Sequence, residues 1–201
     1  MNVKIYIEGG GDSKLQHTQC REGFRKLFEN AGFTGRMPRT FAGGGRGSTF
    51  DAFKTAVAVG DQEAVPVLLV DSEDPVSAAT AWEHLQSREK WERPVAVSDD
   101  QAQLMVACME TWIIADRAAL NRAFGSSLQT SALLPETDLE ARPRDAVQNA
   151  LEHATRGCGR DKAYSKGRRS FQVLAYLDPA TLKQRLPYFR RLLETLDRLL
   201  E

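Results

Sequence analysis

The chain has 201 residues, of which 27 are basic and 27 acidic, so its formal net charge is zero at pH 7. Because 42% of the residues are hydrophobic, the chain can bury a sizeable core without a disulfide or metal, and global disorder is excluded. The longest apolar runs, such as Val65 to Val70 with Pro66 inside, have only about six residues and are too short to span a membrane. Since the N-terminal residues have no signal-peptide core, we expect a cytoplasmic protein. The length predicts one domain, or one domain with a helical extension.

Cysteine and histidine are too sparse and scattered to indicate a zinc site. The cysteines form no CxxC motif and are odd in number, which argues against a disulfide framework and fits a reducing compartment. We expect each histidine to be a surface or capping residue rather than a metal ligand. The residues concerned are Cys20, Cys108, Cys158, His17, His84 and His153.

Charge is unevenly distributed along the chain despite its zero net value. Residues 55–87 contain six acidic side chains and no Lys or Arg, whereas residues 156–169 contain six basic side chains and one acid. An acidic centre with basic flanks suits a cation-assisted site that acts on a polyanion. Ordinary charge scatter in solvated loops gives the same pattern, so charge alone leaves both interpretations open.

Strands and helices alternate over the first hundred residues. Alternating or continuous apolar residues predict the strands, and apolar residues at helical spacing predict the helices. The expected elements are a strand at 3–7, a helix from the caps Asp12 and Ser13 to Ala31, a strand at 36–42, a helix from Ser48 or Thr49 to Val59, a strand at 65–70, a helix at 77–91 and a strand at 94–97. This alternation predicts an α/β fold with a mostly parallel sheet flanked by helices.

The second half of the chain is predicted to be helical. After Asp99, the residues Met105, Met109 and Trp112 recur at helical spacing. The remaining expected elements are a polar connection at 126–144, a helix at 145–154, a basic loop at 156–169 and two final helices. We therefore divide the chain into an α/β core at 1–100 and a helical extension at 101–201, packed together as one structural domain.

Three acidic residues follow the predicted strands at the sheet edge where ligands bind in open parallel sheets. Glu8 ends the first strand, Asp71 ends the third, and Glu73 follows two residues later, where an extended segment would point both side chains the same way. Such carboxylates repel one another unless a cation lies among them or a proton is taken up. Taken singly, each acid is also explained as a cap or turn residue. Together, and without nearby Cys or His, they favour a Mg²⁺ or Mn²⁺ site.

Two segments are rich in glycine, Gly9 to Gly11 and Gly43 to Gly47, and the first can let the backbone approach an anionic ligand at the start of the following helix. Neither is a P-loop, because no GxxxxGK[ST] motif occurs, and the dinucleotide pattern GxGxxG fails at Lys14. Nucleotide-cofactor binding is therefore only weakly supported. Considered alone, the first segment is explained by a tight turn between a strand and a helix.

Substrate phosphates are expected to contact the glycine loops and the basic loop. The candidates are Gly10, Gly11, Lys14, Arg46, Lys162, Lys166 and Arg168. Exposed, solvated loops explain these basic residues equally well. Glu110 is a candidate for supporting the site, because a carboxylate flanked by Met109 and Trp112 is costly to bury without a partner. A surface position for Glu110 is the alternative.

The combination of Glu8 in a glycine-bearing turn with the Asp71 and Glu73 pair resembles the Toprim fold of topoisomerases, primases and OLD-type nucleases. More narrowly, the chain resembles a bacterial family described as a Toprim-like domain of unknown function, number 4276. The segments that carry this resemblance are IYIEGGGDSK at 5–14, LLVDSEDP at 68–75 and LMVACMETWIIAD at 104–116. The resemblance covers most of the chain, whereas the Toprim motif itself covers about residues 3–75.

This resemblance implies a Toprim/Rossmann-like core and a Mg²⁺- or Mn²⁺-dependent nuclease or phosphodiesterase that acts on nucleic acid. It implies that Glu8 ligates the metal or acts as general base. Asp71 and Glu73 would then be ligands, with Asp74 as a possible extra one. The second acid of the usual D-x-D pair is Glu73 here, which lengthens that arm by one methylene. Small Toprim proteins of this kind can act beside an ABC-type ATPase in bacterial defence against phage.

Two other functions stay open at this point. The chain can be a non-catalytic interaction or regulatory subunit of an ABC-type ATPase complex, which would use residues 126–169 and the apolar stripe from Phe189 to Leu200. Core packing is the more common role of such a stripe. A receiver-like phosphoacceptor would use Asp71 but needs paired acids after the first strand, where only Glu8 stands, so it ranks lowest.

Overall fold

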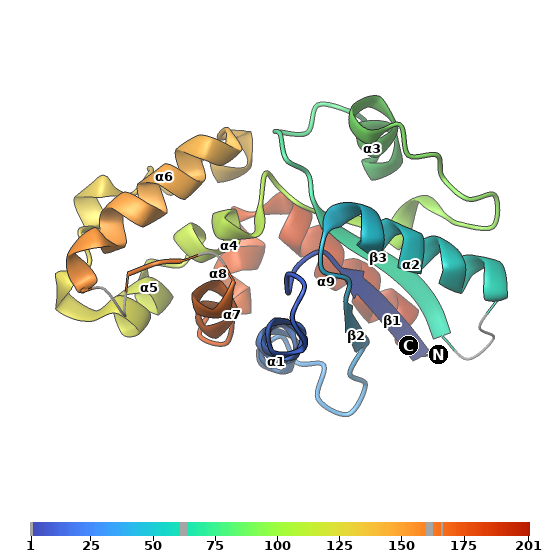
Figure 1. Cartoon of the computed structure of the whole chain (residues 1–201), viewed down its shortest axis with the longest axis horizontal. Coiled ribbons are helices and arrows are strands. Elements are labelled where there is room, and N and C mark those ends of the chain that lie inside the picture. The colour runs from blue at the N-terminus through green and yellow to red at the C-terminus, as the bar shows by residue number, and fades with distance from the viewer. Residues whose placement is uncertain (1, 61–63, 160–162, 166) are drawn as a thin grey trace.

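The computed structural model describes residues 2–60, 64–159, 163–165 and 167–201 (Figure 1). Strands and helices alternate in its first half, as predicted, and helices dominate the second. The strands and α-helices in chain order are β1 (Asn2–Ile7), α1 (Lys14–Asn30), β2 (Arg39–Ala42), α2 (Arg46–Val59), β3 (Ala64–Asp71), α3 (Ala81–Glu89), β4 (Ala102–Met105), α4 (Met109–Ala115), α5 (Arg117–Phe124), α6 (Arg144–Thr155), α7 (Arg168–Leu174), α8 (Pro179–Arg185) and α9 (Pro187–Leu199).

The strands of this described part form one sheet of four parallel strands in the order β2-β1-β3-β4. The prediction of an α/β fold with a mostly parallel sheet flanked by helices is confirmed. Because all strands run the same way, their carboxyl ends lie along one edge of the sheet. The helices α4 to α8 lie on the side toward which the strands point, to the left in Figure 1.

Both faces of the sheet are buried, because successive residues of a strand point to opposite faces. Ile5 and Ile7 of β1 join one hydrophobic cluster with residues of α1 and α9. Tyr6 and Leu68 face the other way and join a second cluster with residues of α2 and α3. Complete burial of an aliphatic side chain contributes roughly 1.5–3 kcal/mol. The sheet is therefore a stable platform for whatever projects from its carboxyl edge.

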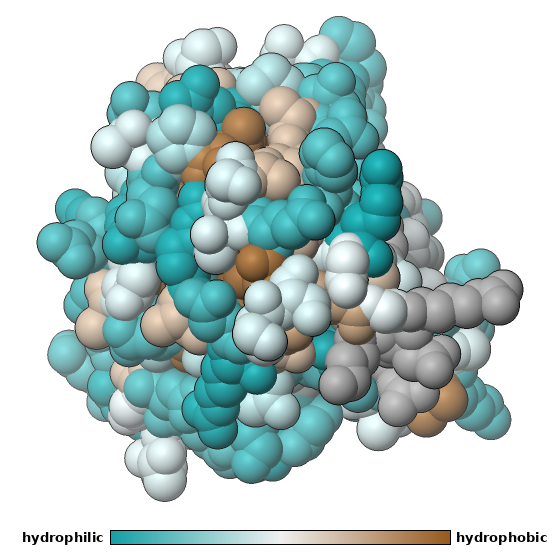
Figure 2. Space-filling view, turned by 90° about the vertical axis from the view of Figure 1, so that its left-hand side faces the viewer, coloured by the Kyte–Doolittle hydropathy of each residue, from teal (hydrophilic) through white to brown (hydrophobic). Residues whose placement is uncertain are grey.

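The apolar stripe of α9 lies inside the first of these clusters. Phe189, Leu192 and Leu196 are fully buried, and the ring centroid of Phe189 lies 4.8 Å from that of Trp112. The expectation of core packing is confirmed, and the alternative of a partner-docking stripe is wrong. Figure 2 shows the side of the molecule that carries α5 and α6, which is mostly hydrophilic with small apolar patches.

Two predicted elements near residue 100 are wrong. The strand expected at 94–97 is a turn, in which the Val97 amide donates to the Pro94 carbonyl at 3.0 Å. The fourth strand is β4, within the segment predicted to be helical, and α4 begins only at Met109. The apolar spacing misled the prediction because both β4 and the helix after it are buried throughout. The described residues also end with three helices, α7 to α9, rather than two.

No helix in the described ranges combines the length and apolarity that crossing a membrane requires. The three cysteines are free and buried, which agrees with the expectation that they build no disulfide framework.

Candidate functional site

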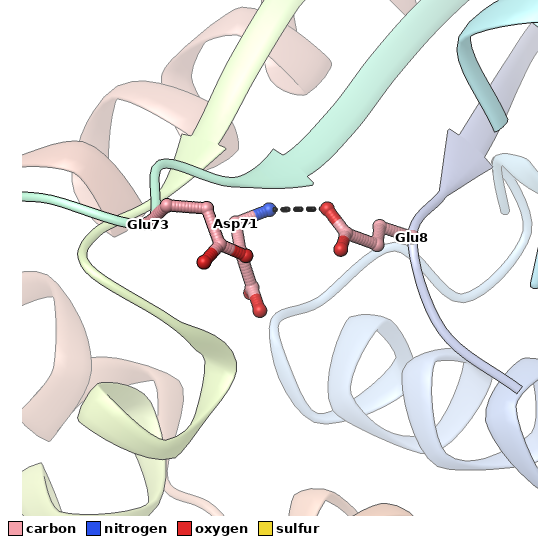
Figure 3. A group of neighbouring side chains, drawn as sticks. All are labelled: Glu8, Asp71 and Glu73. Atoms are coloured by element: carbon pink, nitrogen blue, oxygen red, sulfur yellow. Dashed lines mark hydrogen bonds between the residues drawn. The ribbon is translucent and has the colours of Figure 1, made fainter. Parts of the chain in front are cut away.

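The three predicted metal ligands converge at the carboxyl edge of the sheet (Figure 3). Glu8 follows β1, Asp71 is the last residue of β3, and Glu73 lies two residues beyond it. One carboxylate oxygen from each lies within 4.8 Å of the other two. The parallel pairing of β1 with β3, which places Ile7 opposite Leu69, brings the two strand ends side by side. The structure therefore brings together the acids that the sequence singled out.

Glu73 reaches the cluster through a turn, not through the extended segment that was expected. Its φ of 69° lies in the left-handed region, which is uncommon for a non-glycine residue. The Glu73 amide donates to the Ala107 carbonyl at 2.7 Å, and the Ser72 hydroxyl donates to the Asp74 carbonyl at 2.6 Å. His84, expected to be a surface or capping residue, is buried with Nε2 2.8 Å from the Ser72 carbonyl oxygen. Such strained conformations persist where the surroundings over-determine them, often at functional sites.

Backbone amides orient the other two carboxylates. Glu8 Oε2 accepts a hydrogen bond from the Asp71 amide at 3.1 Å, and Asp71 Oδ1 accepts one from the Met109 amide at 2.9 Å. Asp71 is buried, with 6% of its surface exposed. These bonds fix the directions of both side chains before any ligand arrives, which is how a preorganised site is built.

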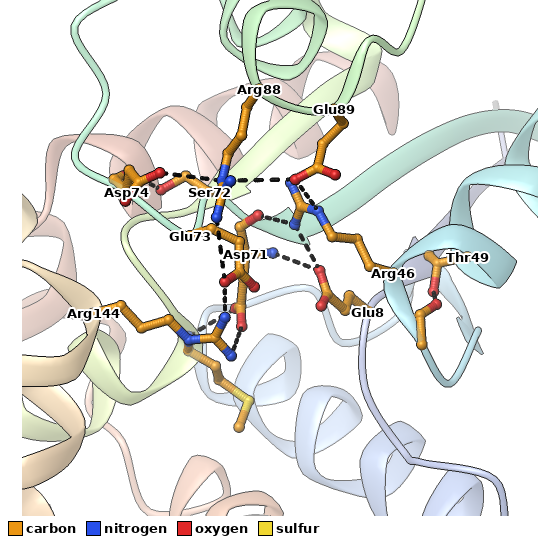
Figure 4. A network of polar contacts seen from close by, with 12 residues as sticks. Glu8, Arg46, Thr49, Asp71, Ser72, Glu73, Asp74, Arg88, Glu89 and Arg144 are labelled. Atoms are coloured by element: carbon orange, nitrogen blue, oxygen red, sulfur yellow. Dashed lines mark hydrogen bonds and ion pairs between the residues drawn. The ribbon is translucent and has the colours of Figure 1, made fainter.

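Arg46, predicted to contact a substrate phosphate, lies within the acidic cluster (Figure 4). Its Nη1 is 3.0 Å from Glu8 Oε2 and also donates to the Asp71 carbonyl, and its Nε is 3.0 Å from Glu89 Oε1. The guanidinium also lies over the ring of Trp91, 5.1 Å from the centroid. With several partners and a side chain only 15% exposed, Arg46 is placed as an internal counterion of Glu8.

Arg88 and Asp74 form the outer rim of the same network (Figure 4). Arg88 Nε lies 3.2 Å from Asp74 Oδ2 and 3.6 Å from Glu89 Oε1, and its Nη2 is 3.8 Å from Glu73 Oε2. Asp74 is 65% exposed and does not belong to the group of three converging oxygens. The structure thus places this possible extra ligand outside the cluster.

Arg144, which sequence reasoning missed, contacts the cluster from the helical half of the chain. It is the first residue of α6, and its Nη1 is paired with Glu73 while its Nη2 lies 4.0 Å from Asp71 Oδ2. Pro143 signals a helix start at this point, but only the fold brings that start to the edge of the sheet. Arg46, Arg88 and Arg144 together offer three positive charges to the three carboxylates, so a cation at this site must compete with arginine.

A cleft of about 430 Å³ opens beside the carboxylates. Gly9 and Gly44 join the two glycine segments through a pair of backbone hydrogen bonds of 2.9 and 3.0 Å. Gly10 has a φ of 93°, and a Cβ atom there would lie 2.8 Å from Cδ2 of His17, so this close approach requires glycine. The cleft is lined by Glu8, Gly9, Gly10, Gly11, Asp12, Gln16, Gly44, Gly45, Asp71, Met109, Glu110, Gly167, Ser170 and Phe171.

Glu110 is buried on α4 and lines this cleft together with Glu8 and Asp71, so the surface position is wrong. The Tyr164 hydroxyl donates to Oε1 of Glu110, and Nε2 of Gln148 lies 3.5 Å from Oε2. Burial, and after it the charge of Glu110, raises the pKa of the Tyr164 phenol above its usual value, so the phenol stays protonated. No sequence motif had pointed to Tyr164, because its partner lies far away in the chain.

The remaining phosphate candidates are not part of the cleft wall that the structure describes. Lys14, the first residue of α1, is exposed and outside the lining. Lys162 and Lys166 lie outside the described residues, and Arg168 is described only as the first residue of α7. Gly10 and Gly11 are the predicted phosphate contacts that line the cleft.

Comparison with known proteins identifies a family without naming an activity. The profile of a family described as "Domain of unknown function (DUF4276)" matches residues 7–197. No curated protein and no solved structure matches the chain. The matched region includes the three converging acids and every residue that lines the cleft.

Proposed function

Because the chain belongs to the DUF4276 family, whose description names no activity, we propose a function from the site itself: a Mg²⁺- or Mn²⁺-dependent, Toprim-like nuclease or phosphodiesterase. The observation that carries the proposal is the convergence of Glu8, Asp71 and Glu73, with one oxygen of each within 4.8 Å of the others. Carboxylate oxygens are the ligands that Mg²⁺ and Mn²⁺ prefer, whereas zinc favours nitrogen and sulfur.

The residues of the cleft divide the work of such a reaction. Glu8, Asp71 and Glu73 would hold the metal, which when bound lowers the pKa of a coordinated water and polarises a phosphoryl oxygen. Gly10 and Gly11 line the cleft without side chains, so a phosphate can approach the carboxylates along their backbone. Glu110 adds a buried carboxylate to the cleft that Glu8 and Asp71 also line, and it fits the supporting role expected of it.

A nucleic-acid substrate is supported by a basic stretch of the sequence that leads to the cleft. The basic segment at 156–169 ends at the cleft, because the cleft is lined by Gly167 of this segment and by Ser170, which directly follows it. Clustered Lys and Arg bind polyanions through the phosphate backbone, independently of base sequence. The segment that carries these clustered basic residues in the sequence therefore ends beside a cleft that Glu8 and Asp71 also line, which favours a polyanionic substrate.

The decisive experiment is cleavage of labelled single- and double-stranded DNA and RNA by wild-type protein and by Asp71→Asn, with Mn²⁺, with Mg²⁺ and with EDTA. We expect metal-dependent cleavage that falls at least about a hundredfold in Asp71→Asn, because a ligand is lost while the side-chain volume is kept. Asp74→Asn is the matched control: it makes the same change three residues away, on a side chain that is 65% exposed, and we expect near-normal cleavage. Equal cleavage by wild type and Asp71→Asn would refute the proposal.

The competing function, a non-catalytic subunit of an ABC-type ATPase complex, loses its main support because the stripe from Phe189 to Leu200 packs into the core. An ATPase partner in phage defence is still compatible with the nuclease and belongs to the proposal as its context. Light scattering of the protein mixed with a candidate ATPase tests this part. A complex that forms but does not change cleavage would argue against a regulatory partner.

A further inference from the structure

Arg144 differs from the other arginines at the cluster in its further contacts. Arg46 is also bound to Glu89 and to a main-chain carbonyl, so it keeps partners if Glu8 turns away. Arg88 is likewise shared with Asp74 and Glu89. Within the described residues, both ion pairs of Arg144 go to Asp71 and Glu73, which are the two proposed ligands from the β3 end.

The guanidinium of Arg144 lies between two of the three proposed metal ligands. Nη1 contacts Glu73 Oε2, and Nη2 lies 4.0 Å from Asp71 Oδ2, so the group bridges the two carboxylates. The Arg144 side chain is 25% exposed, compared with 8% for Asp71 and 15% for Glu73. A partly exposed arginine can move into solvent at little cost, whereas the two acids are held in place by their surroundings.

We propose that Arg144 is an exchangeable counterion, which occupies the space between Asp71 and Glu73 until a divalent cation displaces it. The inference rests on the proposed function, because it assumes that these carboxylates take the metal. It adds that, in the metal-free protein, the Arg144 side chain blocks the metal site between Asp71 and Glu73. Because Arg144 starts α6 while the acids end β3, the same exchange releases a tie between the helical half and the sheet.

The test is a titration of the whole protein with Mn²⁺, followed by electron paramagnetic resonance or calorimetry without nucleic acid. We expect Arg144→Gln to bind Mn²⁺ about tenfold or more tightly than wild type, because the competing charge is gone. Arg142→Gln is the matched control, because it removes the same charge two residues away, and Arg142 has no ion pair among the described contacts with Asp71 or Glu73. Unchanged or weaker Mn²⁺ binding by Arg144→Gln, or equal tightening in both variants, would overturn the inference.

A second variant keeps the test valid if Arg144→Gln folds poorly. Arg144→Lys retains the charge but loses the planar fork that bridges two carboxylates, so we expect tightening smaller than that in Arg144→Gln. No tightening in the lysine variant would then overturn the inference. Failure of this inference is distinguishable from failure of the proposed function. Cleavage that depends on Asp71, with Mn²⁺ affinity independent of Arg144, would reject only the exchange, whereas tighter Mn²⁺ binding without any cleavage would reject only the nuclease.

Discussion

Removal of one hydroxyl group tests how the cleft is held together. Tyr164→Phe keeps the ring but deletes the donor to Glu110, whose surface is only 1% exposed. A hydrogen bond to a charged group contributes about 1.5–3 kcal/mol, and the amide of Gln148, at 3.5 Å, is too distant to replace it. We expect the free energy of unfolding to fall by about 2–3 kcal/mol. For a chain of this length, that loss lowers Tm by roughly 4–12 °C.

A double-mutant cycle measured by urea unfolding isolates this interaction. In a Glu110→Gln background the acceptor is neutral, so we expect Tyr164→Phe to cost only about 1 kcal/mol there. Tyr176→Phe is the matched control, because Tyr176 is 41% exposed and its replacement should change stability by less than about 0.5 kcal/mol. If Tyr164→Phe costs the same in both backgrounds, the hydroxyl does not stabilise the buried carboxylate and the reasoning fails.

The other predictions concern the glycine loop, the core and pH. Gly44→Ala should destabilise the protein more than Gly60→Ala in urea unfolding. The φ angle is positive at both, but a Cβ at Gly44 would lie 2.7 Å from the Gly11 carbonyl oxygen, whereas one at Gly60 would meet no described atom within 4 Å. Equal costs would contradict this. Leu192→Ala should lower the free energy of unfolding by about 2–5 kcal/mol, because the side chain is fully buried, and a negligible change would reopen the docking-face alternative. Burial raises the pKa of Glu140 from 4.5 to about 7, so the folded state binds more protons than the unfolded state in this window. The stability that this group contributes is therefore lost as pH rises from about 4.5 to 7. Over this pH range, the Tm of Glu140→Gln should fall less than the Tm of the wild type. The same dependence of Tm on pH in both proteins would refute the assignment.

The sheet and its acidic edge could be predicted because their signals are local. The run at 65–70 is apolar throughout, as a strand buried on both faces must be, and β3 includes all of it. Once β1 and β3 are both parallel strands of one sheet, their carboxyl ends share an edge, so Glu8 and Asp71 had to be near each other. The sequence could not show the left-handed turn at Glu73, which depends on bonds to residues distant in the chain.

The missed features share one physical cause, namely that tertiary contacts decide them. β4 has only four residues and a buried polar one, Gln103, so its own pattern is too short to separate a strand from a helix. Arg144 and Tyr164 carry no motif, and each acquires its role from a carboxylate on another element. The sequence predicted the acids of this site but not the groups that neutralise or bind them.

If a metal binds here as proposed, charge and distance together explain how it competes with the arginines of the site. Nη2 of Arg144 approaches Asp71 Oδ2 only to 4.0 Å, where two unit charges interact by about 4 kcal/mol at an effective dielectric constant of 20. A divalent ion carries twice the charge and binds carboxylate oxygens at about 2.1 Å for Mg²⁺, so its attraction to the same oxygen is several times greater. The metal loses part of its hydration shell when it binds, which costs free energy. The oxygens of Glu8, Asp71 and Glu73 can compensate for this loss jointly because they converge. The balance favours exchange at Arg144, whose ties are to those ligands, and leaves Arg46 bound to Glu89.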